Sequence, residues 1–492
     1  MKTLDCRKAT AASVCLLVGV FLGRIVSYYQ YFAIVMPFVV LAIGFMLRLF
    51  TKKTFLLVLC VAFALGAAAS VIDARAFGAQ PVEGEYRVSG RVCGTRSDGK
   101  TVLGELSFDG EEKSGKAVVK IGGEYALGTG VSFDCEAETY NTDLFDGYSA
   151  ALYCDGIYYK LTKKGEADAE PGELTVAEKA KKRITDVISL YMSEENAGIM
   201  KSLLFGDKSD LPEETGKAIN GVGLAHIFAV SGLHIGFLAA LFMTVLRKLR
   251  IRRDISLAVV CAVLLGYGAV TGFPSGVKRA TIMLFIAQIA KLTARKNDSL
   301  TTLALSAAII TLTNPRELFD LGFIMSFAAV LGIICFYKPI YRGITKRIKN
   351  KFFVGAAKIL STTLAANAFI LPISFNVFGS FSPYAPVANM IVLPIVSVMF
   401  PVAAFAAVFT LVWQKIGAVF YVTGYALRFM GFFSELIYSW PYSSIAVGSM
   451  GVATAFYVLA LVVLSPFVRM KKKYKYPTVG ALGAAVLVLA FI

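Results

Sequence analysis

Long uninterrupted apolar runs constrain this chain more than any other feature. A helix of about twenty apolar residues crosses the ~30 Å hydrocarbon layer of a bilayer. The clearest runs of this kind cover residues 11–26, 31–46, 54–72, 255–270 and 447–468. About thirteen segments meet the length criterion, the weakest of them near Thr301 and Thr478. The sequence therefore predicts a polytopic α-helical membrane protein with about 12–13 transmembrane helices.

The net charge of +17 is unevenly distributed along the chain. Residues 73–220 are mostly hydrophilic and hold 18 Lys/Arg against 27 Asp/Glu, a net charge of −9, whereas the remainder holds 32 against 6. The basic excess thus belongs to the membrane part, where short cytoplasmic loops collect Lys and Arg. If the N-terminus is cytoplasmic and the chain alternates through thirteen spans, every basic cluster lies in the cytoplasm. The same parity places residues 73–220 outside, as an inserted extracellular domain.

The hydrophilic insertion begins with short β-rich runs. Turn signals separate five of them, at residues 85–92, 101–108, 116–121, 131–138 and 156–161, with one helical insert at 149–153 before the last. This pattern is typical of a small OB-like β-barrel. We expect three transmembrane helices in residues 1–72, the barrel in 73–166, and an acidic linker with amphipathic interfacial helices in 167–220. Residues 221–476 form the main helical membrane domain, and 477–492 a terminal span.

Cysteine and histidine are too sparse to indicate a metal site. The insertion holds Cys93, Cys135 and Cys154, and an oxidising exterior permits one disulfide among them. The strand order of an OB-like barrel favours pairing Cys93 with Cys135. No CxxC pair or Cys/His cluster is present, so we expect neither a metal nor a cofactor.

Residues 221–236 read GVGLAHIFAVSGLHIG and contain both histidines of the chain, His226 and His234, together with Ser231 and four glycines. Titratable groups at membrane depth usually face a cavity or one another. On an ideal helix the two histidines lie about 80° apart, and a break at Ser231 would rearrange them. The alternative is a tight helix crossing in which the histidines bond to neighbours. A serine hydrolase is disfavoured, because the GxSxG elbow and a nearby carboxylate are missing.

A second unusual segment, TGFPSGVKRA at residues 271–280, enters the apolar helix that contains Gln288. Lys278 and Arg279 lie in its first turn, where cations oppose the helix dipole. They also violate the positive-inside pattern. This pair therefore predicts an anionic partner, which can be a lipid phosphate, Asp320 or Glu317, or a phosphate of DNA.

Two further segments place polar residues in or beside apolar helices. Residues 314–327 carry Arg316, Glu317 and Asp320, for which we expect ion pairing with one another, and then Ser326. Residues 367–394 contain prolines and asparagines inside apolar runs, namely Asn367, Pro372, Asn376, Asn389 and Pro394. Such residues imply kinked helices that border protein or a wet cavity. Pore lining and ordinary interhelical hydrogen bonding both fit.

These four segments, in this order, resemble the competence domain of the ComEC family. The similarity lies in GLAHIFAVSGLHIG from Gly223, in TGFPSGVKRA, and in NP followed by DxGFxxSFxAVxGI. It continues in Pro372, in the Phe378-Gly379 turn and in NMIVLP from Asn389, and it extends over essentially the whole chain. The resemblance implies a non-enzymatic channel that carries single-stranded DNA inward across the cytoplasmic membrane during natural transformation.

The resemblance also implies residues and partners. The positions expected to line or shape the DNA path, with Gln288 added from the same helix as Lys278, are His226, Ser231, His234, Lys278, Arg279, Gln288, Ser326 and Asn389. The expected partners are single-stranded DNA, membrane lipid, a surface DNA receptor, a separate nuclease and a cytoplasmic DNA-translocating ATPase. Several tyrosines of the insertion serve either as base-stacking platforms or as barrel core, namely Tyr86, Tyr125, Tyr148, Tyr153, Tyr158 and Tyr159.

The chain departs from the family pattern in two places. Ile324 stands where the family commonly has glutamine, which weakens polar lining at that helix. Many members also continue into an extracellular metallo-β-lactamase-like domain, whereas this sequence stops at Ile492, so either a separate nuclease is required or the sequence is a truncated form. The charge of −9 on the insertion is unfavourable for binding phosphates. A permease for another anionic substrate and a membrane scaffold without transport stay open as alternatives.

Overall fold

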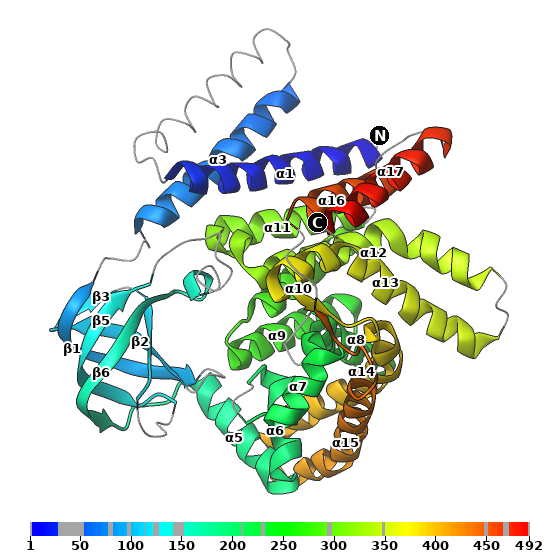
Figure 1. Ribbon diagram of the computed structural model, residues 1–492. Helices are drawn as coiled ribbons and strands as arrows, with labels where there is room; N and C mark the ends of the chain where they lie inside the picture. The colour runs from blue at the N-terminus through cyan, green and yellow to red at the C-terminus, as the bar shows by residue number, and fades with distance from the viewer. Residues whose placement is uncertain are drawn as a thin grey trace. The chain divides into compact units, whose positions relative to one another are not determined.

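The computed structural model of the chain (Figure 1) describes residues 2–27, 54–76, 82–95, 100–113, 115–121, 127–140, 152–207, 210–227, 232–292, 298–346, 350–446, 451–465 and 472–490. The chain divides into two compact units. The first contains Met1–Arg183 and Arg250–Phe323, and the second contains Ile184–Leu249 and Ile324–Ile492.

The helices of the first unit include a tightly packed pair, α1 (Lys2–Ser27) and α3 (Thr54–Ala76). A Cβ added at Gly19 would lie 2.1 Å from the carbonyl oxygen of Phe63, and one at Gly66 would lie 2.2 Å from that of Leu16. These glycines therefore let the two backbones touch. The remaining helical elements of this unit are α9 (Arg253–Thr271), α10 (Ser275–Leu292), α11 (Ser299–Thr313) and the short 3₁₀ turn η2 (Pro315–Phe319).

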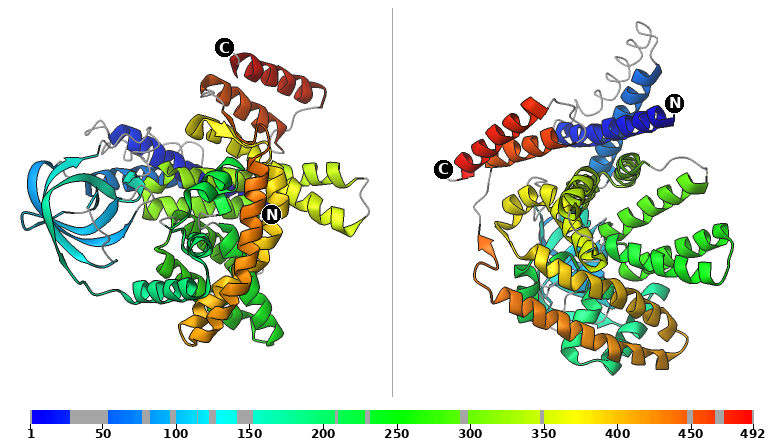
Figure 2. Two further views of the ribbon diagram at one scale, coloured as in Figure 1. Left: turned by 60° about the horizontal axis from the view of Figure 1, so that its bottom comes forward. Right: turned by 90° about the vertical axis from the view of Figure 1, so that its right-hand side faces the viewer.

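The hydrophilic insertion is a small closed barrel, which confirms the prediction of a five-stranded barrel. Its strands are β1 (Glu83–Thr95), β2 (Thr101–Phe108), β4 (Lys116–Val119), β5 (Gly130–Thr139) and β6 (Ile157–Glu170), with a short extra strand β3 (Glu111–Lys113) paired to β2. The ring runs β1-β5-β6-β4-β2 and closes through β1–β2 pairing, with β4 and β6 parallel (Figure 2, left). This arrangement is consistent with the OB-like barrel that the sequence predicts.

The barrel differs from the prediction in its last strand and its tyrosines. β6 continues to Glu170, which pairs with Gly130 of β5, so the first residues of the predicted linker belong to the barrel. Tyr153, Tyr158 and Tyr159 are almost fully buried in the barrel core, and they do not form an exposed stacking platform. Tyr86 packs partly buried against the same core. Tyr125 and Tyr148 lie outside the described residues.

The predicted disulfide between Cys93 and Cys135 is wrong. Both cysteines are free thiols. Cys135 points into the core opposite Tyr86, whereas Cys93 is exposed and lies beyond Arg91, the last residue of β1 that pairs with β5. Neighbouring strands run side by side for a long distance here, so adjacency of two strands does not bring these two thiols together.

The second unit is almost entirely helical. Three short helices follow the barrel, namely α5 (Val176–Tyr191), whose first half belongs to the first unit, α6 (Glu194–Phe205) and α7 (Glu213–Gly221). The other elements are η1 (Ala225–Ile227), α8 (Gly232–Lys248), α12 (Leu321–Thr345), α13 (Lys351–Phe378), α14 (Ala385–Thr410), η3 (Gln414–Gly417), α15 (Ala418–Tyr438), α16 (Gly451–Leu464) and α17 (Lys472–Ala490), with a two-stranded ribbon of β7 (Ser380–Phe381) and β8 (Ile445–Ala446). α12 begins at the end of the first unit.

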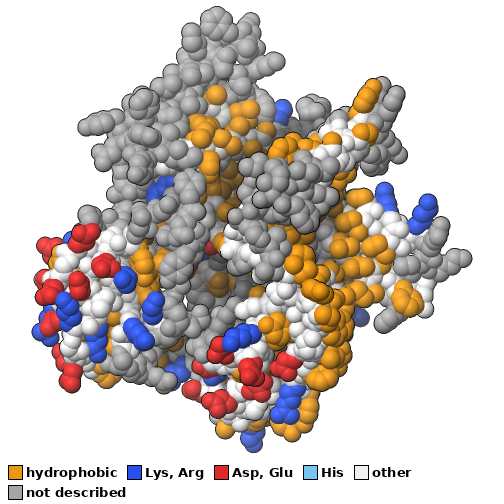
Figure 3. Space-filling view, viewed as in Figure 1, with side chains coloured by type: hydrophobic (Ala, Val, Ile, Leu, Met, Phe, Trp, Pro, Cys, Tyr) orange, Lys and Arg blue, Asp and Glu red, His pale blue; other side chains and the backbone are white. Residues whose placement is uncertain are grey.

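Several described helices are long and apolar enough to cross a bilayer. Five qualify among the described residues, namely Arg253–Thr271, Leu321–Thr345, Phe353–Val377, Ala385–Thr410 and Gln414–Tyr438. Val58–Asp73 and Ser299–Thr313 are shorter apolar helices. Large apolar side chains are exposed on α14 and α15, for example Val398 and Val422, whereas charged side chains gather over the barrel (Figure 3). The figure of 12–13 spans stays a prediction, and so does the extracellular side of the barrel.

Candidate functional site

A built turn between α9 and α10 positions the predicted cation pair. Gly272 ends α9 in the left-handed region, and the N–H of Phe273 donates to the carbonyl oxygen of Gly268 at 2.7 Å, as in a Schellman cap. The ring of Phe273 folds back over Gly268. A Cβ added at Gly268 would lie 2.3 Å from Cε1 of that ring. Pro274 then precedes α10. This turn places Lys278 and Arg279 one turn into α10.

Both cations have carboxylate partners in the next loop of the same unit. Lys278 Nζ lies 3.0 Å from Glu317 Oε1, and Arg279 Nη1 lies 3.7 Å from Asp320 Oδ2. The guanidinium of Arg279 also lies 5.8 Å from the ring centre of Phe323. Among the alternatives for an anionic partner, Glu317 and Asp320 are therefore the ones that the structure brings together with Lys278 and Arg279.

The expected ion pairing of Arg316 with Glu317 and Asp320 is wrong. Successive residues of a 3₁₀ turn point about 120° apart, so Arg316 and Glu317 leave η2 in different directions. Arg316 Nη2 lies 3.1 Å from Asp73 Oδ1, and Arg24 Nη1 lies 3.9 Å from Asp73 Oδ2. Arg316 also donates to the hydroxyl of Tyr158 on the barrel. η2 thus connects α10 on one side with α1, α3 and the barrel on the other.

We call Arg24, Asp73, Lys278, Arg279, Arg316, Glu317 and Asp320 the charged cluster. Most of these side chains are buried, and only Lys278 keeps a large exposed fraction, 41%. The rings of Tyr153 and Tyr158 lie beside the guanidiniums of the cluster, Tyr153 at 4.8 Å from Arg24 and 5.4 Å from Arg316. Buried charges persist only when opposite charges or hydrogen bonds compensate them. Four cations and three carboxylates of the described residues thus compensate one another in this cluster.

A second site lies in the second unit, where residues 221–227 form what we call the glycine turn. A Cβ at Gly221 would lie 2.3 Å from the ring of Tyr438 on α15. Gly223 has a φ of +76°, and a Cβ there would lie 2.9 Å from Cβ of Ala385 on α14. Val222 and Leu224 are fully buried between them. The glycines therefore let the turn pack directly against α14 and α15.

His226 and His234 belong to different elements, the 3₁₀ turn η1 (Ala225–Ile227) and the helix α8 (Gly232–Lys248), and residues 228–231 between them lie outside the described residues. The two histidines consequently do not share one helix, and a break at Ser231 stays a prediction. His226 lies in η1, is exposed, and has Nδ1 3.2 Å from the carbonyl oxygen of Gly223. His234 lies in the first turn of α8, is fully buried, and has its ring centre 4.4 Å from that of Phe400. Ser231 lies outside the described residues.

The other predicted positions divide between the units. Asn389 is 5% exposed and lies one helical turn after Ala385, so it is on the face of α14 that meets the glycine turn. Ser326 on α12 is half-buried in the second unit, and Gln288 on α10 is half-buried in the first. No contact among the described residues assigns a role to Ser326 or Gln288, and their place in the DNA path stays a prediction.

Prolines lie inside α13 and α14 as the sequence predicts, at Pro372, Pro394 and Pro401. The amide of Asn376 donates to the carbonyl oxygen of Pro372 at 2.7 Å and to Thr454 Oγ1 on α16 at 2.6 Å. Asn376 thus serves as an interhelical hydrogen bond, which was one of the two alternatives for this segment.

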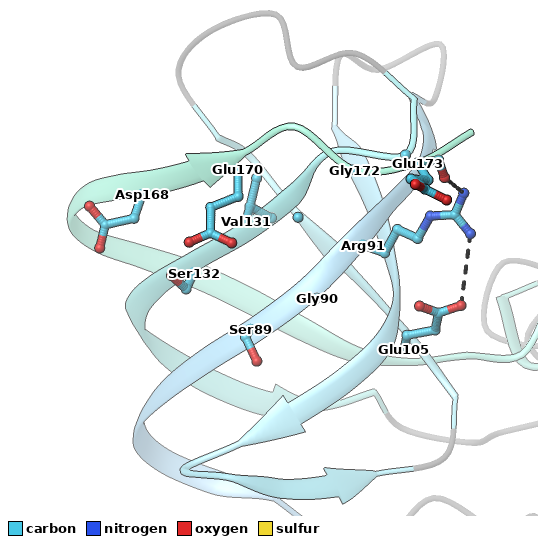
Figure 4. A pocket seen from close by; sticks show the side chains of 12 residues that line it. Ser89, Gly90, Arg91, Glu105, Val131, Ser132, Asp168, Glu170, Gly172 and Glu173 are labelled. Atoms are coloured by element: carbon cyan, nitrogen blue, oxygen red, sulfur yellow. Dashed lines mark hydrogen bonds and ion pairs between the residues drawn. The ribbon is translucent and has the colours of Figure 1, made fainter.

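The barrel carries an open groove of about 420 Å³ between β1, β5 and β6 (Figure 4). Its charged lining is one cation, Arg91, and four carboxylates, Glu105, Asp168, Glu170 and Glu173. Arg91 is already engaged by Glu178 Oε2 at 2.8 Å and by the carbonyl oxygen of Glu173 at 3.0 Å. An acidic groove of this kind repels phosphates.

Comparison with known proteins identifies the family to which the glycine turn and most of the charged cluster belong. Residues 203–472 match the family model described as Competence protein, which is more than half of the chain. The chain belongs to the competence protein family. Together with its apolar helices, this membership makes it a multi-pass membrane protein. The matched region contains the glycine turn, both α10 cations, η2 and α14.

Individual relatives in the family are distant. The chain is 29% identical to ComE operon protein 3 of Bacillus subtilis over 44% of its own length and 26% of that protein. It is 26% identical to Competence protein ComA of Neisseria gonorrhoeae over 55% of its length and 38% of that protein. An uncharacterized protein of Aquifex aeolicus is 29% identical over 42% of the chain and 47% of that protein. The chain thus matches about a quarter to a half of each of these relatives. No solved structure matches it.

Sequence reasoning missed the part of the charged cluster that precedes the competence-family match. Arg24 and Asp73 each stand at the end of an apolar run, and Tyr153 and Tyr158 belong to the barrel. A charged residue at the edge of a span is a recognisable signal that it needs a partner. Which partner it takes depends on contacts between residues far apart in the chain, which spacing cannot reveal.

Proposed function

We propose that this competence-family chain conducts single-stranded DNA across the cytoplasmic membrane during natural transformation. The observation that carries the proposal is the family match over residues 203–472, which contains the glycine turn and the α10 and η2 members of the charged cluster. The names of two relatives, ComE operon protein 3 and Competence protein ComA, support a role in competence. A strand with one negative charge per nucleotide requires cations and hydrated polar groups along its route.

Each unit supplies groups of this kind. In the first, Lys278 keeps 41% of its side chain exposed, so its ammonium can meet a phosphate without prior unfolding. In the second, His226 is exposed in η1, the 3₁₀ turn that precedes α8 in the chain. The first N–H groups of a helix that begins inside a membrane have no helical partner, and they favour anions. The chain acts in this account as a conduit and not as an enzyme.

We propose the orientation of the conduit from its charge distribution and its partners from the family resemblance. By the positive-inside rule, the basic clusters of the membrane part favour a cytoplasmic N-terminus and a barrel on the outer side. A surface receptor delivers duplex DNA, a separate nuclease removes one strand, and a cytoplasmic ATPase draws the other inward. Because its groove is acidic and its described tyrosines pack in or against the core, the barrel holds η2 in place and does not bind the strand.

Uptake of labelled DNA in the native organism tests the proposal. Cells carrying His226→Ala or Lys278→Gln are expected to accumulate about tenfold less DNase-resistant DNA, since one charge-assisted contact is worth roughly 1.5–3 kcal/mol. Lys217→Gln is the matched control, because Lys217 pairs with Glu213 on the exposed surface of the family region. Normal uptake in both test variants, at normal protein levels, would contradict the proposal.

A further inference from the structure

The charged cluster pairs two neighbouring cations with two carboxylates from one short segment. Lys278 and Arg279 are consecutive in α10, and Glu317 and Asp320 both belong to η2 and its final cap. One movement of η2 therefore changes the surroundings of both cations.

The fit between these partners is incomplete. Arg279 is only 5% exposed, yet its Nε and Nη1 make no hydrogen bond with any described residue, and neither does Oε2 of Glu317. A guanidinium that faces a carboxylate well usually forms two parallel bonds of about 2.7–2.9 Å. Here the single ion pair with Asp320 spans 3.7 Å. Donors of Arg279 thus stay available inside a buried site, where each unmade bond costs stability.

Asp320 cannot move closer to Arg279 without losing its hydrogen bond to the start of α12. Its Oδ2 accepts the N–H of Phe323 at 2.7 Å and so caps the start of α12. On the opposite side of η2, Arg316 is held by Asp73 and Tyr158. Among the described residues, the carboxylate of Glu317 has no side-chain hydrogen bond or ion pair except the one with Lys278. Lys278 is the one member of the charged cluster with a large exposed fraction. Glu317 is therefore the carboxylate that an incoming anion displaces most easily.

We propose that Glu317 and Asp320 occupy the place of a phosphate on Lys278 and Arg279, and that a phosphodiester of the transported strand displaces Glu317. The inference rests on the proposed function and adds its regulation. A phosphate offers enough oxygens to bond Lys278 and the unused donors of Arg279 at once. Because one anion replaces another, the exchange leaves no buried cation uncompensated. The carboxylates compete successfully against weakly bound anions, whereas a polyanion binds strongly enough to displace Glu317.

We call the pairing of Glu317 and Asp320 with Lys278 and Arg279 the latch. Binding of single-stranded DNA to the full chain tests it. The chain is purified in nanodiscs of phosphatidylcholine, and its affinity for a fluorescent single-stranded oligothymidylate is measured by anisotropy at low salt. Glu317→Gln removes the competing charge and is expected to raise the affinity about tenfold. Glu213→Gln is the matched control, because it removes the same charge from the exposed pair with Lys217 and is expected to change nothing. Adding Lys278→Gln to Glu317→Gln is expected to abolish the gain.

Further arms identify the source of the phosphate. Excess inorganic phosphate is expected to compete only weakly, and nanodiscs that contain phosphatidylglycerol are expected to preserve the gain. If phosphatidylglycerol abolishes the gain, the site binds lipid headgroups and the inference is overturned. Should Glu317→Gln fail to fold, Glu317→Asp retracts the carboxylate by one methylene, and a smaller gain of the same sign is expected.

The outcomes separate the latch from the proposed function. If Glu317→Gln binds the oligonucleotide no better than the unmodified chain, or no better than Glu213→Gln, the latch is wrong, even where cellular uptake depends on Lys278. If uptake is independent of Lys278 and His226 while Glu317→Gln gains affinity in a Lys278-dependent manner, the anion site stands and the transport function fails.

Discussion

The charged cluster of the first unit and the glycine turn of the second both bring polar side chains among apolar helices, but different contacts hold them. In the cluster, four cations and three carboxylates compensate one another across α1, α3, α10 and η2. In the turn, Gly221 and Gly223 admit α15 and α14 at distances that no side chain would allow. Charge compensation stabilises the first site, and close packing at glycines stabilises the second.

This difference predicts opposite sensitivities. Neutralising one charge in the cluster leaves opposite charges buried without compensation. Adding one methyl group to the glycine turn instead creates a steric clash, with the ring of Tyr438 at Gly221 or with Cβ of Ala385 at Gly223. Substitutions in the two sites, each with a matched control, test this difference in sensitivity.

Asp73→Asn is expected to destabilise the chain most. It removes the carboxylate shared by Arg24 and Arg316, whose side chains are only 12% and 14% exposed. Breaking a buried pair by removing one partner costs about 3–5 kcal/mol. Thermal unfolding in detergent, followed by loss of the monodisperse peak in size-exclusion chromatography, measures the change. Asp254→Asn, in an exposed pair with Arg252, is the control and is expected to leave the midpoint unchanged. Equal unfolding midpoints for the two variants would show that charge compensation does not stabilise the charged cluster.

Gly223→Ala is expected to have the second largest effect. Its φ of +76° costs an alanine about 1–2 kcal/mol, and overpacking against Cβ of Ala385 adds about 1–3 kcal/mol. Together these terms predict a loss of about 2–5 kcal/mol in the free energy of unfolding, which lowers the midpoint in the same thermal assay. Gly236→Ala is the control, because a Cβ at Gly236 meets nothing within 4 Å. A Gly223→Ala chain as stable as Gly236→Ala would show that close packing is not what maintains the turn.

Glu178→Gln is expected to have a moderate effect that depends on pH. Partial burial raises the pKa of Glu178, but hydrogen bonds from Thr175 and Arg91 outweigh it and hold the pKa below the ordinary 4.5. A lowered carboxyl pKa contributes stability above the ordinary pKa, and that stability is lost as the pH falls through the lowered value.

The substitution is thus expected to cost about 1–2 kcal/mol at pH 7, from a capping bond and a partly exposed ion pair. The difference from the unmodified chain shrinks as the pH falls below 4. Hydrogen exchange in the first turn of α5 provides the measurement, and Glu170→Gln, at the exposed end of β6, is the control. A difference that persists unchanged at low pH would argue against this role.

The smallest expected effect concerns the barrel cysteines, where reducing agent should change nothing. Burial raises the pKa of Cys135 to about 11, so its thiol stays protonated and unreactive at neutral pH. Cys93 is exposed. Alkylation without reductant, read by peptide mass spectrometry, is expected to modify Cys93 readily and Cys135 only after unfolding. A peptide pair linked through Cys93 and Cys135 would contradict the described register.

The barrel was the part of the fold most open to prediction from sequence. Its strands alternate apolar and polar residues, and turn signals bound them, so local patterns predict five strands close to their observed positions. The end of β6 was missed because Gly165 and the acidic residues after it are typical of a linker, whereas pairing with β5 carries the strand to Glu170. The thiol pairing failed for a similar reason, since strand order does not determine how far along two strands a residue lies.

The candidate sites were predictable in their residues but not in their contacts. Lys278 and Arg279 violate two local rules, so a need for anions is visible in the sequence. That Glu317 and Asp320 meet this need while Arg316 turns toward Asp73 depends on the path of η2 between distant helices. The histidines likewise differ in exposure because His226 lies in the 3₁₀ turn η1 and His234 in the helix α8, whereas their spacing alone indicates one shared face.

Accessibility of cysteines placed at the two histidines tests most directly whether the family region encloses a wet passage for a polyanion. In cells whose native cysteines are replaced, a membrane-impermeant maleimide is expected to modify His226→Cys, and DNA in transit is expected to slow that reaction. His234→Cys, at a fully buried position, is expected to stay unmodified. A His226→Cys chain that reacts at the same rate with and without DNA, or does not react at all, would contradict the account.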